Sequence, residues 1–297
     1  MLAKWQAEFV RKKILEATGV DAEIVIVKTT GDKLQQAPLS QIAGKGVFIK
    51  ELEEALLYEQ IDLAVHSVKD IPTEVPSRLC FPVICRREDT RDCLVAANGE
   101  TLASLRQGAR VGTSSLRRQA QIRHARADLD IRDLRGNVDT RLRKVSSGEY
   151  DAILLAKAGL DRLGWSNRIS EVLSPEVCMP AVGQGALGVQ ARLKDAEIAD
   201  ALAPLDDYET RQSIVAERAL LGALEGGCQV PLGAWARLER GELTMDAVVC
   251  SPDGVQYIRQ RASAPPDQAR ELGQRVAQLL IDSGAREILE EVYRQRG

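Results

Sequence analysis

Short apolar runs alternate with helical segments through the middle of this chain, and no other feature limits its fold as strongly. Strands are predicted over residues 79–85, 92–97, 130–134 and 152–156, and a further strand ends near Gly112. Helices are predicted between them, one of which begins near Ser115 and another of which ends near Ser147. Strands that alternate with helices usually form a mostly parallel sheet with helices on both faces. The middle of the chain is therefore predicted to be a doubly wound α/β domain.

The flanking regions add elements on both sides of this core. Further helices are predicted over residues 2–18, 48–58, 196–203 and 208–224, and further strands over 22–27 and 61–72. Residues 29–46 include polar residues and glycines and lack the apolar periodicity of a helix or strand. This pattern predicts a long loop around Lys45. Strands over 234–238, 243–249 and 255–259, with helices from Asp267 onwards, predict a small α+β domain with an antiparallel sheet.

Two segments are predicted to carry the chain between domains. They are the charged turn 86–91 and the glycine-rich run 180–190, which does not match the Gly-x-Gly-x-x-Gly pattern of dinucleotide-binding folds. Three domains follow, made of residues 1–86 with 184–204, residues 91–180, and residues 208–297. The predicted fold class is α/β, with two doubly wound domains and a smaller α+β domain at the C-terminal end.

The composition argues against several classes of protein. The net charge is -3 over 297 residues and aromatic residues make up 4%, whereas nucleic-acid binders usually carry a basic excess and rings for stacking. No apolar run is long enough to span a membrane and no secretory signal opens the chain, so a cytoplasmic protein is expected. The 6 cysteines form no Cys-x-x-Cys pair, and with only 2 histidines neither a metal site nor a disulfide is predicted.

Residues 111–119, Val-Gly-Thr-Ser-Ser-Leu-Arg-Arg-Gln, predict an anion-binding turn between a strand and a helix. Thr113 and Ser115 lie where a helix offers unpaired N–H groups and the positive end of its dipole. Arg117 and Arg118 follow, and a guanidinium group binds carboxylate or phosphate through two parallel hydrogen bonds. The alternative is a solvated helix face whose arginines pair with carboxylates four residues away.

Polar residues also fall at two other predicted strand ends. Arg135 lies at one of them beside Gly136, and Ser67, Lys69 and Asp70 lie at the other. Ligands of open α/β sheets bind at this edge. A carboxylate there can accept hydrogen bonds from substrate N–H groups or stabilise a developing cation. A helix cap or an ion pair with Lys69 is an equally good interpretation of Asp70.

Cys228 lies in the small-residue loop Glu-Gly-Gly-Cys-Gln-Val-Pro, where another molecule could approach its thiol closely. Most isolated cysteines are instead small, buried apolar residues without reactivity, and that is the alternative interpretation.

Five motifs in order along essentially the whole chain resemble the porphobilinogen deaminase family, also called hydroxymethylbilane synthase. They are His66-Ser-Val-Lys-Asp-Ile-Pro72, Gly112-Thr-Ser-Ser-Leu-Arg-Arg-Gln119, Leu134-Arg-Gly-Asn-Val138, Pro180-Ala-Val-Gly-Gln-Gly185 and Glu225-Gly-Gly-Cys-Gln-Val-Pro231. The family condenses four porphobilinogen molecules head to tail into hydroxymethylbilane, with release of ammonia, for tetrapyrrole synthesis. The resemblance implies three domains, of which the first two are similar to periplasmic binding proteins. A monomer without nucleic-acid or membrane partners is expected.

The resemblance also implies roles for individual residues. Cys228 would hold a dipyrromethane cofactor through a thioether, and Asp70 would be the catalytic aspartate that stabilises a cationic intermediate. The other matching positions bind carboxylates of the cofactor or the substrate. Those of the cofactor are Lys69, Thr113, Ser115, Arg117, Arg118, Arg135 and Gly136, and those of the substrate are Lys45, Ser67 and Arg141.

The N-terminus departs from the family pattern. Family members begin with a strand of the form Arg-Ile-Ala/Gly-Thr-Arg-x-Ser, whereas this chain begins Met-Leu-Ala-Lys-Trp-Gln. A truncated, inactive form of the enzyme is therefore one alternative. Another is a non-catalytic anion-binding module on the same fold, for which binding would be reversible and Cys228 dispensable. A nucleic-acid binder would instead show affinity that falls steeply with salt.

Overall fold

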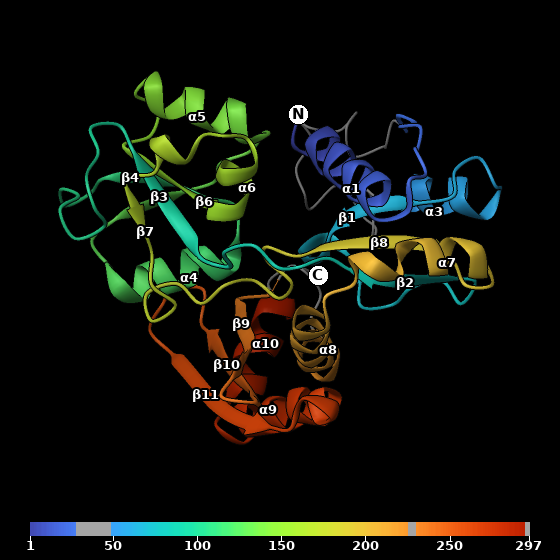
Figure 1. The fold of residues 1–297 in the computed structure, drawn as a ribbon. Helices are drawn as coiled ribbons and strands as arrows, with labels where there is room; N and C mark the ends of the chain where they lie inside the picture. Colours follow the sequence, from blue (N-terminus) through green and yellow to red (C-terminus); the bar gives the residue numbers. More distant parts are fainter. Residues whose placement is uncertain (28–48, 225–229, 295–297) are drawn as a thin grey trace. The chain divides into compact units, whose positions relative to one another are not determined.

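The computed structural model describes residues 1–27, 49–224 and 230–294 (Figure 1). The chain forms two compact units, residues 1–88 with 186–211 and residues 89–185 with 212–297. It therefore passes between the units three times. The first two passages fall within the predicted segments 86–91 and 180–190, and the third lies inside helix α8 (Tyr208–Ala223). The predicted separation of residues 91–180 from residues 208–297 stays a prediction. No described helix is long and apolar enough to cross a membrane.

The first unit contains a three-stranded sheet in the order β1 (Ala64–Ser67), β8 (Leu187–Arg192), β2 (Leu79–Ile84). Strand β8 is antiparallel to both of its neighbours. The expectation of a mostly parallel sheet is therefore wrong for these strands. The described helices of this unit include α1 (Leu2–Thr18), α3 (Lys50–Leu57) and α7 (Ala196–Leu202). Val10 and Ile14 of α1 pack against Leu187 and Val189 of β8 in the core of the unit.

Helix α1 has the predicted bounds, but the strand predicted after it is absent. The helix ends at Gly19, whose φ of 73° is a left-handed conformation that glycine adopts without strain. Residues 21–27 form neither helix nor strand, and Val25 and Ile26 are 55% and 75% exposed. β-Branched residues favour a strand when neighbouring strands and an apolar surface cover them. Two adjacent exposed side chains have no such cover, so the prediction of a strand over 22–27 is wrong.

The second unit contains a five-stranded sheet in the order β5 (Asp130–Arg132), β4 (Arg110–Gly112), β6 (Ala152–Ala156), β3 (Asp92–Ala96), β7 (Glu171–Val172). Strand β4 is parallel to β5 and β6, whereas β3 is antiparallel to β6 and β7. The sheet is mixed rather than mostly parallel. Strands β3, β5 and β6 lie where the sequence predicts them, within two residues at each end, and β4 ends at Gly112 as predicted. Strand β7, of two residues, was not predicted.

Helices cover both faces of this sheet, namely α4 (Leu116–Ala125), α5 (Val138–Ser146) and α6 (Lys157–Arg162). Leu154 of β6 belongs to a core that includes Ile122 of α4. Its neighbour Ile153 belongs to a second core with Leu142 of α5 and Leu160 of α6. Successive side chains of a strand point to opposite faces, so the two cores lie on opposite sides of the sheet. The doubly wound α/β class is confirmed for this part of the chain.

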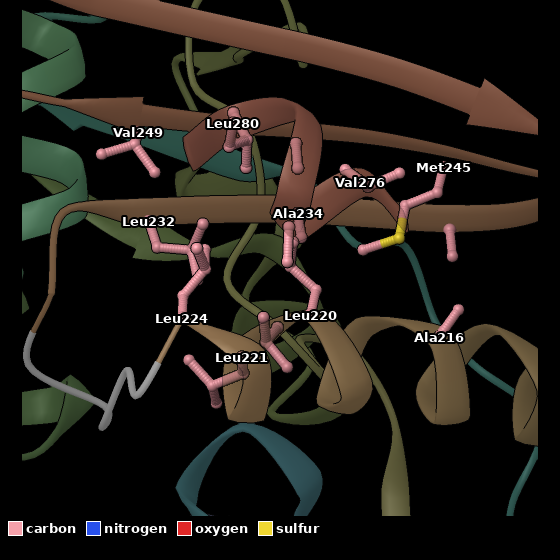
Figure 2. Close-up of a cluster of buried hydrophobic side chains, with 14 of the residues drawn as sticks. Ala216, Leu220, Leu221, Leu224, Leu232, Ala234, Met245, Val249, Val276 and Leu280 are labelled. Atoms are coloured by element: carbon pink, nitrogen blue, oxygen red, sulfur yellow. The ribbon is translucent and has the colours of Figure 1, made fainter. Parts of the chain in front are cut away.

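The C-terminal part of the second unit has an antiparallel sheet in the order β11 (Tyr257–Ala264), β10 (Glu242–Cys250), β9 (Leu232–Glu239). The helices beside it are α8, α9 (Ala269–Asp282) and α10 (Ala285–Arg294). Leu220 of α8, Met245 of β10 and Val276 of α9 share one core (Figure 2). The predicted α+β arrangement is confirmed. Strand β11 runs five residues beyond the predicted end at Arg259, because it pairs with β10 from Leu243 to Cys250.

Candidate functional site

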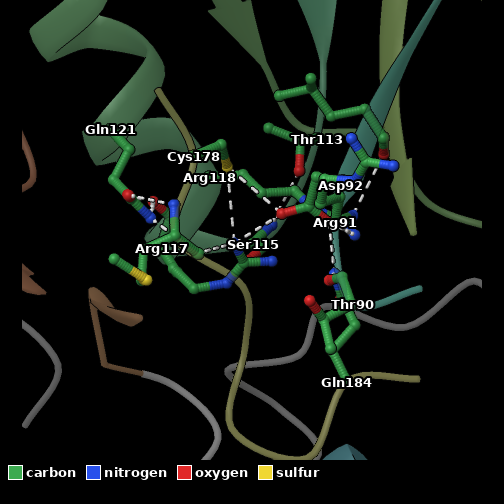
Figure 3. A network of polar contacts seen from close by, with 12 residues as sticks. Thr90, Arg91, Asp92, Thr113, Ser115, Arg117, Arg118, Gln121, Cys178 and Gln184 are labelled. Atoms are coloured by element: carbon green, nitrogen blue, oxygen red, sulfur yellow. Dashed lines mark hydrogen bonds and ion pairs between the residues drawn. The ribbon is translucent and has the colours of Figure 1, made fainter. Parts of the chain in front are cut away.

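The predicted anion-binding turn joins β4 to α4 in the second unit (Figure 3). Ser115 is the N-cap residue of α4, but its side chain makes no capping hydrogen bond. The buried Thr113 hydroxyl instead accepts a hydrogen bond of 3.2 Å from the Ser115 backbone N–H. Ser114 Oγ donates to the Leu134 carbonyl at 2.8 Å and accepts from the Leu134 N–H at 3.0 Å. These bonds fasten the turn to the segment that follows β5.

Arg117 and Arg118 begin α4, and both side chains turn inward onto the carboxylate of Asp92 on β3. Arg117 Nη1 lies 2.6 Å from Asp92 Oδ2, and Arg118 Nη2 lies 2.7 Å from Asp92 Oδ1. The two arginines are 4% and 6% exposed, and Asp92 is fully buried. The alternative of a solvated helix face is therefore wrong for this pair.

The charges of this cluster do not cancel. Burial alone would raise the pKa of Asp92, but the positive charges of Arg117 and Arg118 hold it well below its usual value. The carboxylate is thus ionised at neutral pH. Two guanidinium groups against one carboxylate leave one net positive charge in the interior, which is costly unless an anion approaches it.

Two further buried side chains complete the network around Asp92. Cys178 Sγ donates to Asp92 Oδ2 at 3.2 Å, and Gln184 Nε2 donates to Asp92 Oδ1 at 2.8 Å (Figure 3). Burial raises the pKa of the Cys178 thiol to about 12, so this cysteine is an inert hydrogen-bond donor. Gln121 of α4 receives the Met179 N–H at 2.7 Å and holds the segment that carries Cys178.

The turn between β5 and α5 contributes a third arginine. Arg141 of α5 is partly buried, and its Nε donates to the carbonyl of Gly136 at 2.7 Å. Among the residues that the structure describes, no carboxylate pairs with Arg141. Burial and the positive charge of Arg118 lower the pKa of Arg141 to about 10. The positive charge of Arg118 thus opposes that of Arg141, and a bound carboxylate would relieve this repulsion.

The local sequence explains how this turn forms. Asn137 caps α5, with its side chain accepting from the Thr140 N–H at 2.9 Å. Gly136 has φ of 109°, and a Cβ there would lie 2.8 Å from Thr140 Cγ2. Only glycine fits this position without strain. Arg135, half-buried, precedes it at the predicted place after β5.

Three predicted residues belong to the first unit. Ser67 ends β1 and receives a hydrogen bond of 2.9 Å from Gln6 Nε2 of α1. Lys69 and Asp70 follow in a 3-10 turn, Val68–Asp70, where Asp70 is exposed and Lys69 is half-buried. Asp70 thus lies at a strand end, as the sequence predicts. Although the residue is exposed as a whole, burial of its carboxyl by the surrounding chain raises the pKa of Asp70, and the positive charge of Lys69 opposes this shift. Because β1 is antiparallel to β8, the position of Asp70 does not follow from the rule that ligands bind at the carboxyl ends of parallel strands.

The remaining predicted site residues, Lys45 and Cys228, lie outside the described residues. No group of histidines, cysteines and carboxylates in the described ranges could hold a metal ion. The described cysteines, at positions 80, 85, 93, 178 and 250, form no disulfide bond with one another.

Sequence reasoning missed Asp92 and Gln184. A signal for Asp92 was present, because a carboxylate at the start of the apolar run Cys93-Leu-Val-Ala96 has to find a buried partner. Gln184 stood among glycines, where nothing in the pattern distinguishes a structural amide from a solvated one.

Two family models match the chain. Residues 1–200 match "Porphobilinogen deaminase, dipyromethane cofactor binding domain", and residues 212–282 match "Porphobilinogen deaminase, C-terminal domain". The porphobilinogen deaminase of Syntrophobacter fumaroxidans is 51% identical over 276 residues, which are 93% of this chain and 89% of the relative.

Some solved structures are similar to a large part of the chain at low identity. A periplasmic domain of BvgS from Bordetella pertussis is 16% identical with a TM-score of 0.38, covering 67% of this chain and 75% of the domain. A periplasmic binding protein of Salmonella typhimurium with high arginine specificity is 13% identical with a TM-score of 0.37, covering 67% of this chain and 80% of that protein.

Proposed function

The chain belongs to the porphobilinogen deaminase family, and on that premise we propose that it is a hydroxymethylbilane synthase. In this reaction four porphobilinogen molecules condense head to tail into hydroxymethylbilane, and one ammonia leaves at each step. The protein is thus a transferase of tetrapyrrole and haem biosynthesis. The observation that carries the proposal is the match to both family models along the chain, with the motif residues in place.

The arginines of the second unit support the proposal chemically. Porphobilinogen bears an acetate and a propionate, so each condensation adds two carboxylates that must be bound. The Asp92 cluster retains one net positive charge, and Arg141 adds a second without a carboxylate partner among the described residues. Arginine suits these groups because its planar fork matches a carboxylate and keeps its charge.

The donor set also fits the dipyrromethane cofactor, whose side chains are carboxylates. We assign its binding to Lys69, Thr113, Ser115, Arg117, Arg118, Arg135 and Gly136, and its thioether to Cys228. When bound, the cofactor supplies the terminal pyrrole from which the chain grows. We assign substrate carboxylates to Arg141, with Ser67 and Lys45.

Asp70 is the residue to which we assign the chemistry. Loss of ammonia from porphobilinogen leaves an electrophilic carbon, and attack by a pyrrole on it produces a cation. A carboxylate next to the pyrrole N–H groups stabilises that cation and can move the proton that is lost at the end of the step. Burial raises the pKa of the Asp70 carboxyl, which favours a group that takes up and releases a proton.

We further propose that the enzyme acts in the cytoplasm as a monomer, without a nucleic-acid partner. The net charge of -3 and the 4% of aromatic residues support the absence of a nucleic-acid partner, because nucleic-acid binding needs a basic surface and usually stacking rings.

An intact mass under denaturing conditions tests the proposal. The chain should carry a mass excess equal to two linked pyrrole units and should convert porphobilinogen to hydroxymethylbilane. Cys228→Ser should lose both the excess and the turnover, whereas the matched control Cys80→Ser should keep both, since Cys80 is a half-buried thiol in β2. A bare sequence mass together with absent turnover would favour the non-catalytic anion-binding module.

A further inference from the structure

Building on the proposed function, we propose that Asp92 is a positioning residue: it holds Arg117 and Arg118 in the orientation that binds substrate and cofactor carboxylates. We assign to Gln184 the role of fixing Asp92. Neither residue needs to touch the ligand for this role.

The Asp92 carboxylate is saturated by donors from three parts of the chain. Oδ1 accepts from Arg118 Nε at 3.1 Å, Arg118 Nη2 at 2.7 Å and Gln184 Nε2 at 2.8 Å. Oδ2 accepts from Arg117 Nη1 at 2.6 Å and Cys178 Sγ at 3.2 Å. Five donors around a fully buried carboxylate leave no lone pair for a proton in transit or for a ligand. Asp92 therefore acts on the arginines and not on the reacting atoms.

Arg118 is fixed on three sides by this arrangement. Its Nε and Nη2 bind Asp92 on β3, its Nη1 donates to the Leu154 carbonyl on β6 at 3.1 Å, and its backbone belongs to α4. A guanidinium held in this way cannot rotate freely about its long side chain. The positive charge of Arg118 contributes to the lowered pKa of Arg141, so a carboxylate held by Arg118 would favour the charged form of Arg141 as well. When a carboxylate binds here, the arginine side chains lose less conformational entropy than two mobile arginines would lose.

Gln184 ties the carboxylate to the main chain. Its Nε2 donates to the Thr90 carbonyl at 2.7 Å as well as to Asp92, so both amide hydrogens are used. Its neighbour Gly183 donates its N–H to Glu217 of α8 at 2.7 Å. The segments by which the chain enters and leaves residues 89–185 are thus joined to each other through the amide that holds Asp92.

The chain contains a matched control for a buried aspartate between two arginines. Asp246 of β10 is 2% exposed and lies 2.9 Å from both Arg237 Nη1 and Arg259 Nη2, in the C-terminal sheet. Removing its charge disturbs a similar ion pair that has no part in the proposed binding of carboxylates.

The test compares Asp92→Asn, Gln184→Met and Asp246→Asn in the full-length protein, each at a temperature where circular dichroism shows it folded. Asp92→Asn is expected to raise KM for porphobilinogen at least tenfold, and Gln184→Met several-fold. Asp246→Asn should leave KM within twofold while lowering the melting temperature. Equal changes of KM in Asp92→Asn and Asp246→Asn, or an unchanged KM in Asp92→Asn, would overturn the role. If Asp92→Asn does not fold, the KM of Gln184→Met decides whether Asp92 has the proposed role.

A second readout does not depend on turnover. The ¹⁵N spectrum of arginine side chains, with the Arg118 Nε–H signal assigned by Arg118→Lys, should show a rigid Arg118 group that shifts on titration with tricarballylate. In Gln184→Met the signal should show a mobile Arg118 side chain, and the affinity for tricarballylate should fall several-fold. A chain without turnover that still shows this behaviour would refute the proposed function but retain the role of Asp92. A mobile Arg118 in the unmodified chain would refute the role of Asp92.

Discussion

The imidazole of His124 stacks on the phenol ring of Tyr257, with 4.4 Å between ring centroids and 13° between the ring planes. His124 lies in the last turn of α4, and Tyr257 begins β11. His124 Nδ1 also lies 2.8 Å from the Gly254 carbonyl oxygen, and Arg123 Nη1 donates to the Pro252 carbonyl at 2.7 Å. The helix that carries the arginine pair at its start is therefore anchored at its end to the turn before β11.

Gly254→Ala should damage this anchor. Gly254 has φ of 82°, and an added Cβ would lie 2.5 Å from the His124 backbone nitrogen. The left-handed conformation costs about 1–2 kcal/mol for a non-glycine residue, and overpacking adds about 1–3 kcal/mol. Urea unfolding should show the sum of these losses. In the control Gly241→Ala, φ is 85° but nothing lies within 4 Å, so only the first loss is expected. Equal losses in the two variants would contradict the close contact.

Arg141→Gln should weaken the binding of porphobilinogen. A hydrogen bond to a charged group contributes about 1.5–3 kcal/mol, which corresponds to a decrease in kcat/KM of about 10- to 100-fold. Arg143→Gln is the matched control, because Arg143 lies two residues further on α5 with 71% of its side chain exposed, paired with Asp139 at 3.2 Å. Initial rates of both variants test this. A loss of similar size in Arg143→Gln would remove any special role for Arg141.

Asp70→Asn should keep the fold and lose most of the turnover. The amide is isosteric but carries no negative charge and is a poor proton acceptor, so kcat should fall about 10²- to 10⁴-fold. The melting temperature should not fall, because burial raises the pKa of Asp70 and the ionised carboxylate therefore does not stabilise the fold. Asp62→Asn, an exposed aspartate that pairs with Arg192 at 2.7 Å, serves as the control and should retain turnover. Bilane formation by Asp70→Asn near the rate of the unmodified chain would exclude the assigned role.

His66 should make the protein less stable as the pH falls from 7 to 5. Burial lowers the pKa of His66 to about 4, and the neighbouring Gln190 side chain opposes this shift. The unfolded chain has a histidine pKa of about 6.5, so between these values the unfolded state binds more protons and the free energy of unfolding decreases with falling pH. The decrease from pH 7 to pH 5 should be about 2 kcal/mol.

Urea unfolding of the unmodified chain and of His66→Gln at both pH values measures this effect. The variant removes the titrating group, so the difference between the two proteins isolates His66 from all other groups. An equal pH dependence in both proteins would show that the imidazole is not buried in its neutral form.

Most helices and strands could be predicted because their apolar spacing reports burial directly. Helix α1 and strands β3 and β6 lie where that spacing places them. Strand direction could not be predicted in this way, since a buried run reads the same whether its neighbour is parallel or antiparallel. The central position of β8, between β1 and β2, depends on a chain segment about a hundred residues away. Residues 22–27 were predicted as a strand that the structure does not have. Their local β-propensity was strong, but no apolar surface among the described residues covers them.

The site was predictable in its location and not in its internal pairing. Thr113, Ser115 and the two arginines stand at a strand-to-helix turn, as the glycine and hydroxyl pattern indicates. Which way the guanidinium groups point depends on Asp92, which is 25 residues from Arg117 in the sequence. A single sequence contains both residues but not their distance in space. The charge balance of this cluster, two guanidinium groups against one carboxylate, therefore becomes visible only in the folded chain.

The order of strands in the first unit also constrains how the protein folds during synthesis. Strand β2 ends at Ile84, and its partner β8 begins at Leu187. At about 5–20 residues per second, translation of the intervening chain takes roughly 5–20 s. During that interval β1 and β2 leave the ribosome without the strand that joins them, while the strands and helices of residues 92–172 are all complete before β8 exists. The five-stranded sheet is therefore able to form first, and the earlier part of the chain is the nascent segment that depends most on protection from aggregation.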